Sequence, residues 1–217
     1  MNAYQTISAP VCAEFVEKRS RFLAYLSSVG TREEAVEQIE AIKRKHRDAT
    51  HHVPAYRLYH TGVEHCSDDG EPAGTAGQPT LSVLQNEELF DVSLVIVRYF
   101  GGVLLGGGGL VRAYSHAAAL AVRAARRVLR CSCERLRLAV PYPLYGKLQF
   151  FLSSRALTPC SCDYGEQITV EVLVRAEFSE RIQAELTELS GGRIGISSSG
   201  AIESDYPISS AEESAQV

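Results

Sequence analysis

The sequence predicts an α+β protein of two domains, and three observations carry this prediction. Residues 134–205 read as strand, helix, strand, strand, helix, strand, which is the split βαβ order of ferredoxin-like domains. Residues 1–133 also mix strands with helices, and nine of the 17 glycines lie between Gly70 and Gly109. The net charge is +1 over residues 1–133 and −5 over residues 134–217. We therefore expect a boundary at residues 133–134 and a flexible tail over residues 206–217.

The first domain begins with a strand and a helix that local patterns define. Residues 21–29 are rich in β-favouring side chains and end at a glycine. Thr31 is placed as an N-cap with Glu34 at the capping-box spacing, so a helix is expected after it. Two more strands are expected, over the alternating residues 55–60 and over the apolar run 94–97, which feeds directly into glycines.

The second domain begins after residues 131–134, which interrupt a helical pattern that starts near Gly109. Ser179 is expected to cap the second helix of this domain, and Gly191 with Gly192 is expected to end it. The elements expected here are a strand over 136–140, a helix over 144–154, an extended segment over 156–163, a strand over 167–176, the Ser179 helix, and a strand over 194–202.

The composition excludes several classes of protein. The chain has 217 residues, of which 45% are hydrophobic, so it is not disordered in bulk. No apolar stretch reaches the ~18 residues that a membrane span needs, and the first residues lack the basic and apolar regions of a secretory signal. Six cysteines are too few for a disulfide framework. We expect free thiols, a cytoplasmic location and no resident cofactor.

A basic stripe is predicted on the helix that follows the glycines. At 100° per residue its arginines gather on one side of the helix and its apolar side chains on the other. Such a stripe suits a phosphate backbone, because each guanidinium presents a fork of N–H donors. The alternative is a solvated face whose arginines pair with acids from elsewhere in the fold. The stripe is predicted to comprise Arg112, His116, Arg123, Arg126, Arg127 and Arg130.

The glycine-rich segment before that helix is a candidate anion site. Backbone N–H groups in such a loop and the N-terminus of a helix both attract anions. The segment matches neither the P-loop pattern nor the dinucleotide-binding pattern. A tight turn with close packing between helix and strand accounts for the same glycines without any ligand. The candidate residues are Gly101, Gly102, Gly108 and Gly109, with Arg98 just before them.

Candidate acid–base residues lie in an acidic turn and in a nearby histidine. Asp68, Asp69 and Glu71 offer carboxylates for proton transfer or for a hard cation, and His51 offers an imidazole. Asx-turn chemistry accounts for the two aspartates equally well. The histidines and the Cys-x-Cys pairs lack the spacing of a zinc site, so no metal ligand is predicted.

Five blocks of the sequence resemble the YigZ/IMPACT family. The three longest are SDDGEPAGTAGQP at residues 67–79, VRYFGG at residues 97–102 and GGLVRAY at residues 108–114. Residues 18–22 and 48–57 match earlier blocks of the same family. The blocks span the chain from about residue 18 to residue 115, and the remainder resembles the small C-terminal domain of bacterial members.

The resemblance implies a fold and a role. It implies a first domain like a ribosomal-protein module with a left-handed βαβ crossover, and a second similar to the last domain of elongation factor G. It also implies a cytoplasmic protein linked to translation and nucleic-acid binding, with no established catalytic residue. The sequence departs from the family where Val53 and Pro54 follow His52, so a cysteine-dependent role there is not expected. It shows no extra N-terminal domain like that of eukaryotic members, so regulation of the starvation-sensing kinase is not expected either.

Three functions remain open on the sequence. The leading one is a non-enzymatic RNA- or ribosome-associated protein, which contacts phosphates through the stripe and the glycine loop, while the aromatic residues beside Arg98 stack on bases. Its acidic second domain would contact a protein partner, and no membrane is involved. The first alternative is an enzyme acting on a small anionic or phosphorylated ligand at residues 67–77 and 98–112. The second alternative is a protein-interaction regulator without nucleic-acid contact.

Overall fold

The computed structural model describes residues 3–207, whose contacts divide the chain into two units. The N-terminal unit is Tyr4–Leu129 with residues 206–207, and the C-terminal unit is Arg130–Asp205 with residue 3. The division falls inside the long strand β7 (Arg127–Val140), near the expected boundary at residues 133–134. The first residues of the expected tail belong to the last strand, β10 (Gly195–Pro207), and residues 208–217 lie outside the described residues. Within residues 3–207, no helix is both long and apolar enough to cross a membrane.

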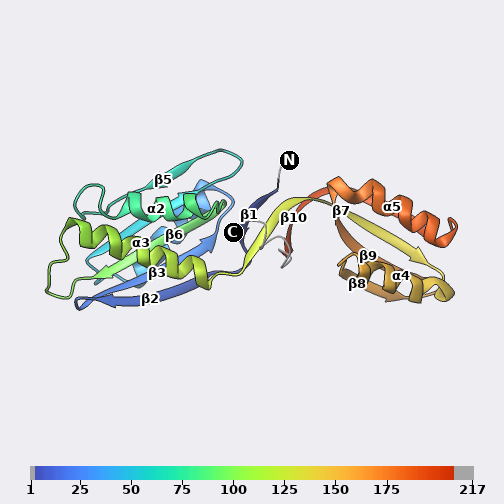
Figure 1. Ribbon diagram of the computed structural model, residues 1–217, viewed down its shortest axis with the longest axis horizontal. Helices are drawn as coiled ribbons and strands as arrows, with labels where there is room; N and C mark the ends of the chain where they lie inside the picture. The colour runs from blue at the N-terminus through green and yellow to red at the C-terminus, as the bar shows by residue number, and fades with distance from the viewer. Residues whose placement is uncertain (1–2, 208–217) are drawn as a thin grey trace. The chain divides into compact units, whose positions relative to one another are not determined.

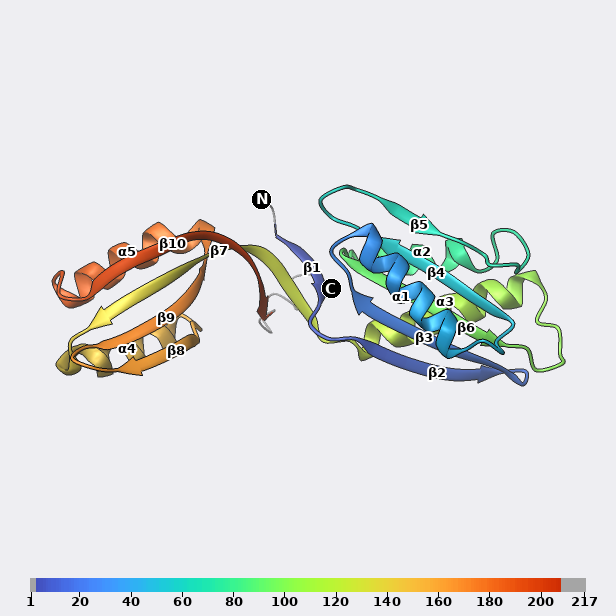
Figure 2. The ribbon, with the colours of Figure 1, turned by 180° about the vertical axis from the view of Figure 1, so that it is seen from behind.

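The N-terminal unit is built on an antiparallel sheet with helices on both faces (Figure 1). The strand order is β2-β3-β6-β4-β5, and every neighbouring pair is antiparallel. Helices α2 and α3 cover one face, and α1 covers the other, as the reverse view shows (Figure 2). The bounds are β2 (Val11–Glu17), β3 (Ser20–Ser28), α1 (Arg32–Lys45), β4 (His51–Arg57), β5 (Glu64–Cys66), α2 (Gly77–Asn86), β6 (Val92–Tyr99) and α3 (Gly107–Ala124).

Burial on both faces explains the apolar run in the central strand. Residues 92–97 of β6 are all buried, with Leu94 and Ile96 facing α2 and α3 while Val95 and Val97 face α1. A strand that is covered on both sides loses the alternation of a half-exposed strand and reads as a continuous apolar run. This strand therefore agrees with its prediction from the sequence.

Helix α1 begins as its sequence predicts. The Thr31 hydroxyl accepts the Glu34 N–H at 3.2 Å, which satisfies one of the free amides of the first turn. The Glu34 carboxylate accepts the Gly30 N–H at 2.6 Å rather than that of Thr31. Glutamates in the first turn and basic residues in the last turn complement the helix dipole.

The strand expected over residues 55–60 begins earlier and ends earlier. Strand β4 pairs with β6 from His51 opposite Arg98 to Arg57 opposite Val92. After Arg57 the chain turns back, with the Leu58 N–H donating to the Val63 carbonyl at 2.9 Å. The pairing with β6, a contact distant in sequence, sets these limits and places His51 inside the strand.

Helix α3 does not continue to residue 130, so the predicted stripe of six basic residues on one helix is wrong. The helix ends at Ala124, and Ala125 is already extended. Residues from Arg127 onward belong to β7, which pairs with β9 and β10 and with β1 (Tyr4–Ile7). Just past β1, the Ser8 N–H donates to the Arg126 carbonyl at 3.0 Å. Pairing between strands overrides the helical pattern of this segment.

The C-terminal unit has the predicted order β-α-β-β-α-β, with strands side by side in the order β10-β7-β9-β8. Its second helix starts earlier than expected. It begins at Ala176, after Arg175, so the predicted cap Ser179 is buried inside the helix. The Ser179 hydroxyl donates to the Glu134 carboxylate at 2.6 Å. The helix ends at Gly191, as predicted, and this glycine adopts the left-handed conformation. The remaining bounds are α4 (Tyr142–Ser154), β8 (Pro159–Tyr164), β9 (Ile168–Arg175) and α5 (Ala176–Ser190).

Candidate functional site

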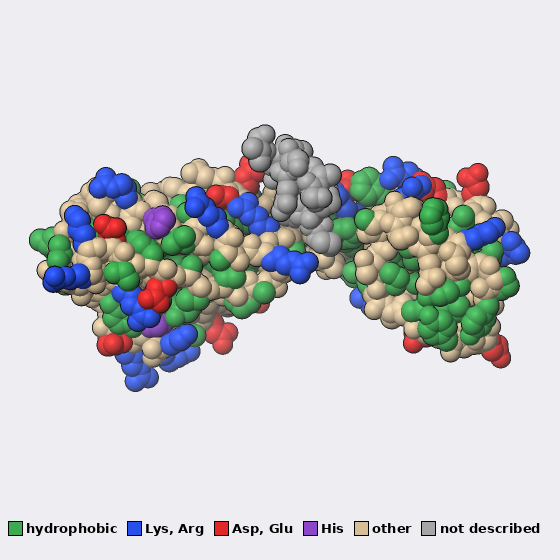
Figure 3. All heavy atoms as spheres, turned by 60° about the horizontal axis from the view of Figure 1, so that its bottom comes forward, with side chains coloured by type: hydrophobic (Ala, Val, Ile, Leu, Met, Phe, Trp, Pro, Cys, Tyr) green, Lys and Arg blue, Asp and Glu red, His purple; other side chains and the backbone are tan. Residues whose placement is uncertain are grey.

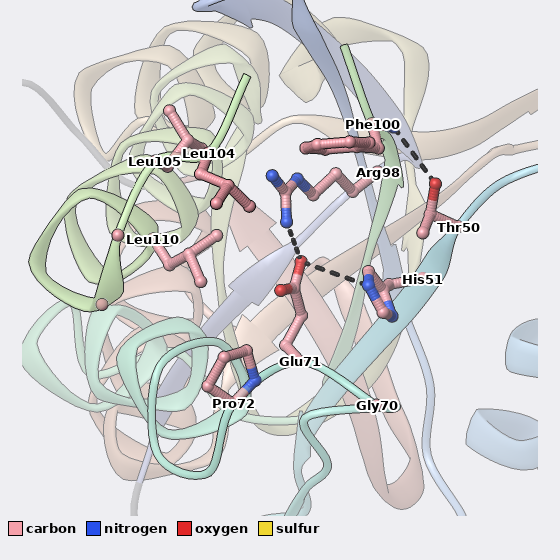
Figure 4. A pocket seen from close by; sticks show the side chains of 12 residues that line it. Thr50, His51, Gly70, Glu71, Pro72, Arg98, Phe100, Leu104, Leu105 and Leu110 are labelled. Atoms are coloured by element: carbon pink, nitrogen blue, oxygen red, sulfur yellow. Dashed lines mark hydrogen bonds and ion pairs between the residues drawn. The ribbon is translucent and has the colours of Figure 1, made fainter. Parts of the chain in front are cut away.

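Segments that are far apart in sequence surround one cavity in the N-terminal unit (Figure 4). The cavity has a volume of about 350 Å³, which is within the range of small-molecule sites. The register of the sheet places His51, Arg98 and Phe22 in one row across β4, β6 and β3. The acidic turn and the start of α3 close over this row. The lining residues are Thr50, His51, Gly70, Glu71, Pro72, Arg98, Phe100, Leu104, Leu105, Gly106, Gly107 and Leu110.

The centre of the cavity wall is a buried ion pair. The Arg98 guanidinium donates through Nη1 to Glu71 Oε1 at 2.5 Å, and these side chains are only 6% and 3% exposed. The Tyr114 hydroxyl donates to the same carboxylate oxygen at 2.8 Å. Burial, and then the charge of Glu71, raises the pKa of Tyr114, so its hydroxyl remains a donor. The carboxylate therefore fixes the position of the guanidinium.

His51 completes this cluster from the neighbouring strand. Its Nδ1 lies 2.8 Å from the carbonyl oxygen of Asp69, which only accepts, so Nδ1 carries a proton. Its Nε2 lies 3.7 Å from Glu71 Oε1. Two of the four predicted acid–base residues, His51 and Glu71, thus meet at the cavity.

The other two acid–base candidates serve the backbone of the acidic turn. The Asp68 carboxylate accepts the N–H groups of Gly74 at 2.8 Å, Ala76 at 3.0 Å and Gly77 at 2.8 Å. Partial burial raises the pKa of Asp68, but these backbone bonds outweigh burial and leave the pKa below its ordinary value. The Asp69 carboxylate accepts the His52 N–H at 2.6 Å. Neither aspartate lines the cavity, and both carboxylates hold backbone N–H groups, although these lie farther along the chain than an Asx turn reaches.

Arg98 is held among aromatic rings and has one donor without an acceptor. Its guanidinium carbon lies 5.6 Å from the ring centres of both Phe22 and Phe100. Its Nη2 donates to the Ser20 hydroxyl at 3.3 Å. Its Nε is buried and has no hydrogen-bond partner among the described residues. A buried donor without an acceptor is costly, and it is rare in native proteins.

Gly101 and Gly102 are explained by packing and not by a ligand. A Cβ on Gly101 would lie 2.0 Å from the backbone carbon of Arg19, so the chain fits here only without a side chain. The Gly101 N–H already donates to the Ser20 hydroxyl at 3.3 Å. Gly102 adopts φ +79°, which glycine tolerates best. The predicted role of their amides in holding an anion receives no support from this geometry.

The start of α3 offers free backbone donors next to the cavity. The first α-helical hydrogen bond runs from the Leu110 N–H to the Gly106 carbonyl at 2.9 Å. The amides of Gly107, Gly108 and Gly109 therefore precede the helical ladder, and no side chain caps them. The first turn holds no acidic residue, so the positive end of the helix dipole is not neutralised locally.

A second cavity of about 440 Å³ lies beside the first and shares Leu105 with it. It is lined by Lys18 from the β2–β3 turn and by Arg112 and His116 from α3, together with Phe15, Glu17, Leu105, Gly109 and Ala113. A Cβ on Gly108 would lie 3.8 Å from Arg112 Nη1, so this guanidinium lies close to the first turn of α3. Figure 3 shows Lys and Arg side chains interspersed with hydrophobic ones at this end of the unit.

The remaining predicted arginines are dispersed. Arg123 is exposed on the last turn of α3, and Arg126 is exposed beyond it. Arg127 forms an ion pair with Glu87, and Arg130 pairs with both oxygens of Asp205 at 2.7 and 3.0 Å. Arg127 and Arg130 therefore follow the alternative prediction, in which the arginines pair with acids from elsewhere in the fold.

The cysteines and histidines do not gather into a metal site within residues 3–207, where no group of three or more His, Cys, Asp and Glu is placed to hold an ion. Cys131 and Cys133 are buried with their sulfurs 3.6 Å apart. Burial, and then a hydrogen bond with Cys131, raises the pKa of Cys133 to about 12.

Sequence reasoning missed Ser20 and the hydrogen bond that Tyr114 makes to Glu71. Ser20 is buried and serves Arg98 and Gly101 from the far side of a hairpin turn. The block at residues 18–22 was the only sequence signal that pointed to this turn. Lys18 and Arg19 have φ values of 44° and 67°, which glycine-free turns rarely show.

Two family models match the chain. The model of the Impact N-terminal domain matches residues 18–122, which include all the residues that line the first cavity and most of those that line the second. The model described as a domain of unknown function, DUF1949, matches residues 138–193 in the C-terminal unit.

Curated relatives match the chain over most of its length. The IMPACT family member YvyE of Bacillus subtilis is 34% identical over 197 residues, which cover 90% of this chain and 91% of the relative. The IMPACT family member YigZ of Escherichia coli is 30% identical over 197 residues, covering 89% and 97%. A crystal structure described as that of a hypothetical protein is 29% identical, covers 97% of this chain and 99% of its own, and superimposes with a TM-score of 0.60.

Proposed function

The chain belongs to the IMPACT family, and from this membership we propose that it binds RNA in a translation-related role. We propose that RNA contacts the end of the N-terminal unit at which the two cavities lie. This surface replaces the basic stripe along α3 that the sequence predicts. The observation that carries the proposal is the free start of α3, which lies between Arg98 in one cavity and Lys18 and Arg112 in the other. The link to translation rests on the family resemblance.

Three properties of this end suit a nucleic-acid strand. Lys18 and Arg112 make no ion pair within residues 3–207, so their charges remain available for phosphates. The free amides of α3 add partial positive charge at the same place. The ring of Phe100 is 46% exposed beside them and offers a face on which a base can stack.

The net charge of the chain does not oppose this proposal. No acidic residue occurs from Gly101 to Cys133, and the carboxylates around the first cavity are already engaged, whereas Glu17 lines the second cavity beside Lys18 and Arg112. Glu71 accepts from Arg98, and Asp68 and Asp69 accept backbone N–H groups. A chain with a net charge of −4 can therefore present a local positive potential at this end.

The salt dependence of RNA binding tests the proposal. Replacing Lys18 and Arg112 with alanine should weaken binding to single-stranded RNA and flatten the salt slope by about 0.7 per lost phosphate contact. The matched control replaces Arg123 and Arg126, which removes the same charge about 16 Å or more farther along the α3 direction. The control should bind nearly as the parent protein does. Equal losses in both double variants, or no loss in the first, would reject the proposed contact.

We also propose a fold type for each unit and a kind of partner for the C-terminal unit. We expect the N-terminal unit to be of the ribosomal-protein-like type with a left-handed crossover, and the C-terminal unit to be ferredoxin-like. The strand order β10-β7-β9-β8 supports the second assignment. Residues 130–205 carry a net charge of −2, and we expect this unit to contact a protein partner instead of RNA. A cytoplasmic location follows from the same role.

A further inference from the structure

We propose that the cavity between Arg98 and the start of α3 binds one nucleotide, with its phosphate at the helix and its base on the apolar wall. This inference rests on the proposed function, since an RNA strand would supply such a nucleotide, but a free nucleotide offers the same chemistry. Phosphate recognition and base recognition are carried by different residues of the cavity.

The phosphate end is defined by donors that lack acceptors. Arg98 is 5% exposed and lines the cavity, yet its Nε has no hydrogen-bond partner among the described residues. Gly107 lines the same cavity and begins α3, whose first amides have no intrahelical acceptor. An oxyanion beside the helix start would accept from the first amides of α3, because a phosphate carries several strong acceptor oxygens. Arg98 Nε is buried in the cavity wall, so a small rotation of the guanidinium would let it donate to the same oxyanion.

Glu71 does not prevent an anion from binding there. Its Oε1 already accepts from Arg98 and from Tyr114, and it lies 3.7 Å from His51 Nε2. The Arg98–Glu71 pair is neutral as a unit, so the partial positive charge of the helix terminus sets the sign of the potential. The carboxylate holds the guanidinium on the cavity wall, which lowers the entropy cost of anion binding.

The base end is defined by apolar side chains that remain exposed. Leu104 is 83% exposed and Phe100 is 46% exposed, and both line the cavity together with Leu105 and Leu110 (Figure 4). Large apolar side chains at that exposure lose contact with water when a flat ring covers them.

The second cavity can bind the neighbouring phosphates of an RNA strand. It shares Leu105 with the first cavity and carries Lys18 and Arg112. A free nucleotide would use the first cavity only, whereas an RNA strand would use both. The two sources of the ligand therefore differ in their dependence on Lys18 and Arg112.

A matched pair of substitutions at Gly107 tests the phosphate end. A Cβ there would meet only Thr75 Cγ2 at 4.0 Å, so a side chain fits. Gly107→Asp and Gly107→Asn differ mainly in charge. An acidic residue in the first turn stabilises a helix, so a loss of binding in the Gly107→Asp variant would not reflect unfolding. We expect Gly107→Asp to weaken binding of uridine 5′-monophosphate at least tenfold relative to Gly107→Asn, as measured by NMR titration of the full chain.

Ligand truncation and Leu104→Ser test the base end. Uridine and ribose 5-phosphate should each bind at least tenfold more weakly than the nucleotide, because each lacks one of the two contacts. Leu104→Ser should weaken nucleotide binding severalfold and leave binding of ribose 5-phosphate unchanged. Equal affinity of the two Gly107 variants, or of uridine and its monophosphate, would overturn the inference.

Binding of an oligouridine, measured beside binding of the mononucleotide, separates this inference from the proposed function. If the oligomer binds through Lys18 and Arg112 but the mononucleotide does not bind, the inference fails and the proposed function stands. If the mononucleotide binds as predicted and the oligomer does not, the inference stands with a free nucleotide as ligand, and the proposed function fails. If neither binds, both fail.

Discussion

The guanidinium of Arg98 and the carboxylate of Glu71 form a buried ion pair that fastens the acidic turn to the central strand β6. Their closest atoms, Nη1 and Oε1, are 2.5 Å apart, and both side chains are almost fully removed from solvent. The two residues lie 27 positions apart in the sequence. The pair closes one wall of the candidate site, so the stability of the unit and the shape of the cavity depend on the same contact.

Removing one partner of this pair should cost far more than removing both. Glu71→Ala leaves a buried guanidinium without its counter-charge and should lower the free energy of unfolding by about 3–5 kcal/mol. The single changes Glu71→Leu and Arg98→Met should each cost more than the double change, because each single change leaves its partner buried alone. Urea unfolding followed by circular dichroism provides the double-mutant cycle, and strictly additive losses would contradict a coupled pair.

Two adjacent glycines should respond differently to alanine. Gly101→Ala would place a Cβ 2.0 Å from the Arg19 backbone and should destabilise the protein at the upper end of overpacking effects, by about 3 kcal/mol. Gly102→Ala meets no atom within 4 Å but must adopt φ +79°, which should cost about 1–2 kcal/mol. Thermal unfolding of the two variants measures the difference. The reverse order would show that the β2–β3 turn moves aside freely.

The charge of Asp68 should stabilise the acidic turn at neutral pH. Asp68→Asn keeps one acceptor but loses the charge-assisted bonds to three backbone N–H groups, so we expect a loss of about 1–2 kcal/mol at pH 7. Because the folded pKa lies below the ordinary 3.8, the contribution is present above that value and disappears as the pH falls through the folded pKa.

Chemical unfolding of the parent protein and the Asn variant at several pH values checks this dependence. The difference should be constant from about pH 5 to 8 and shrink below about pH 4. A difference that grows on acidification would have the wrong sign.

The cysteines should fall into two classes of reactivity. Cys12 and Cys160 are exposed, whereas Cys131 and Cys133 are buried, and the pKa of Cys133 is raised to about 12 mainly by burial. Since the thiolate is the reactive form, brief alkylation at pH 8 should modify the exposed pair and spare the buried pair until denaturant is added. Mass spectrometry of the peptides reads this out. Rapid labelling of Cys133 in the native protein would contradict the burial of β7.

Local sequence signals were sufficient where a segment's structure depends on its nearest neighbours. The Thr31 cap, the helix end at Gly191 and the apolar run of β6 depend on a turn of helix or on a single strand, and the sequence predicts each of them. Ser179 was misplaced for the same reason. Serine is a common helix cap, but the Ser179 hydroxyl bonds to Glu134 on strand β7, which is distant in the sequence.

The candidate site was predicted as a set of residues but not as an arrangement. Asp68, Asp69 and Glu71 are nearly adjacent in the sequence and look equivalent there. In the fold, only Glu71 turns toward the cavity, because the aspartates are held by backbone N–H groups and Glu71 by Arg98. The choice among three carboxylates is made by partners that lie in other segments.

The sequence by itself determined the two α+β parts, most of their strands and helices, and the family to which the chain belongs. Only the tertiary structure decided that residues 127–133 form a strand, that Arg127 and Arg130 pair with Glu87 and Asp205, and that the cavity lies beside the start of α3. The physical reason is the range of the forces involved. Helix caps, turns and hydrophobic periodicity act over a few residues, whereas strand pairing, burial and ion pairing join residues that are distant in sequence.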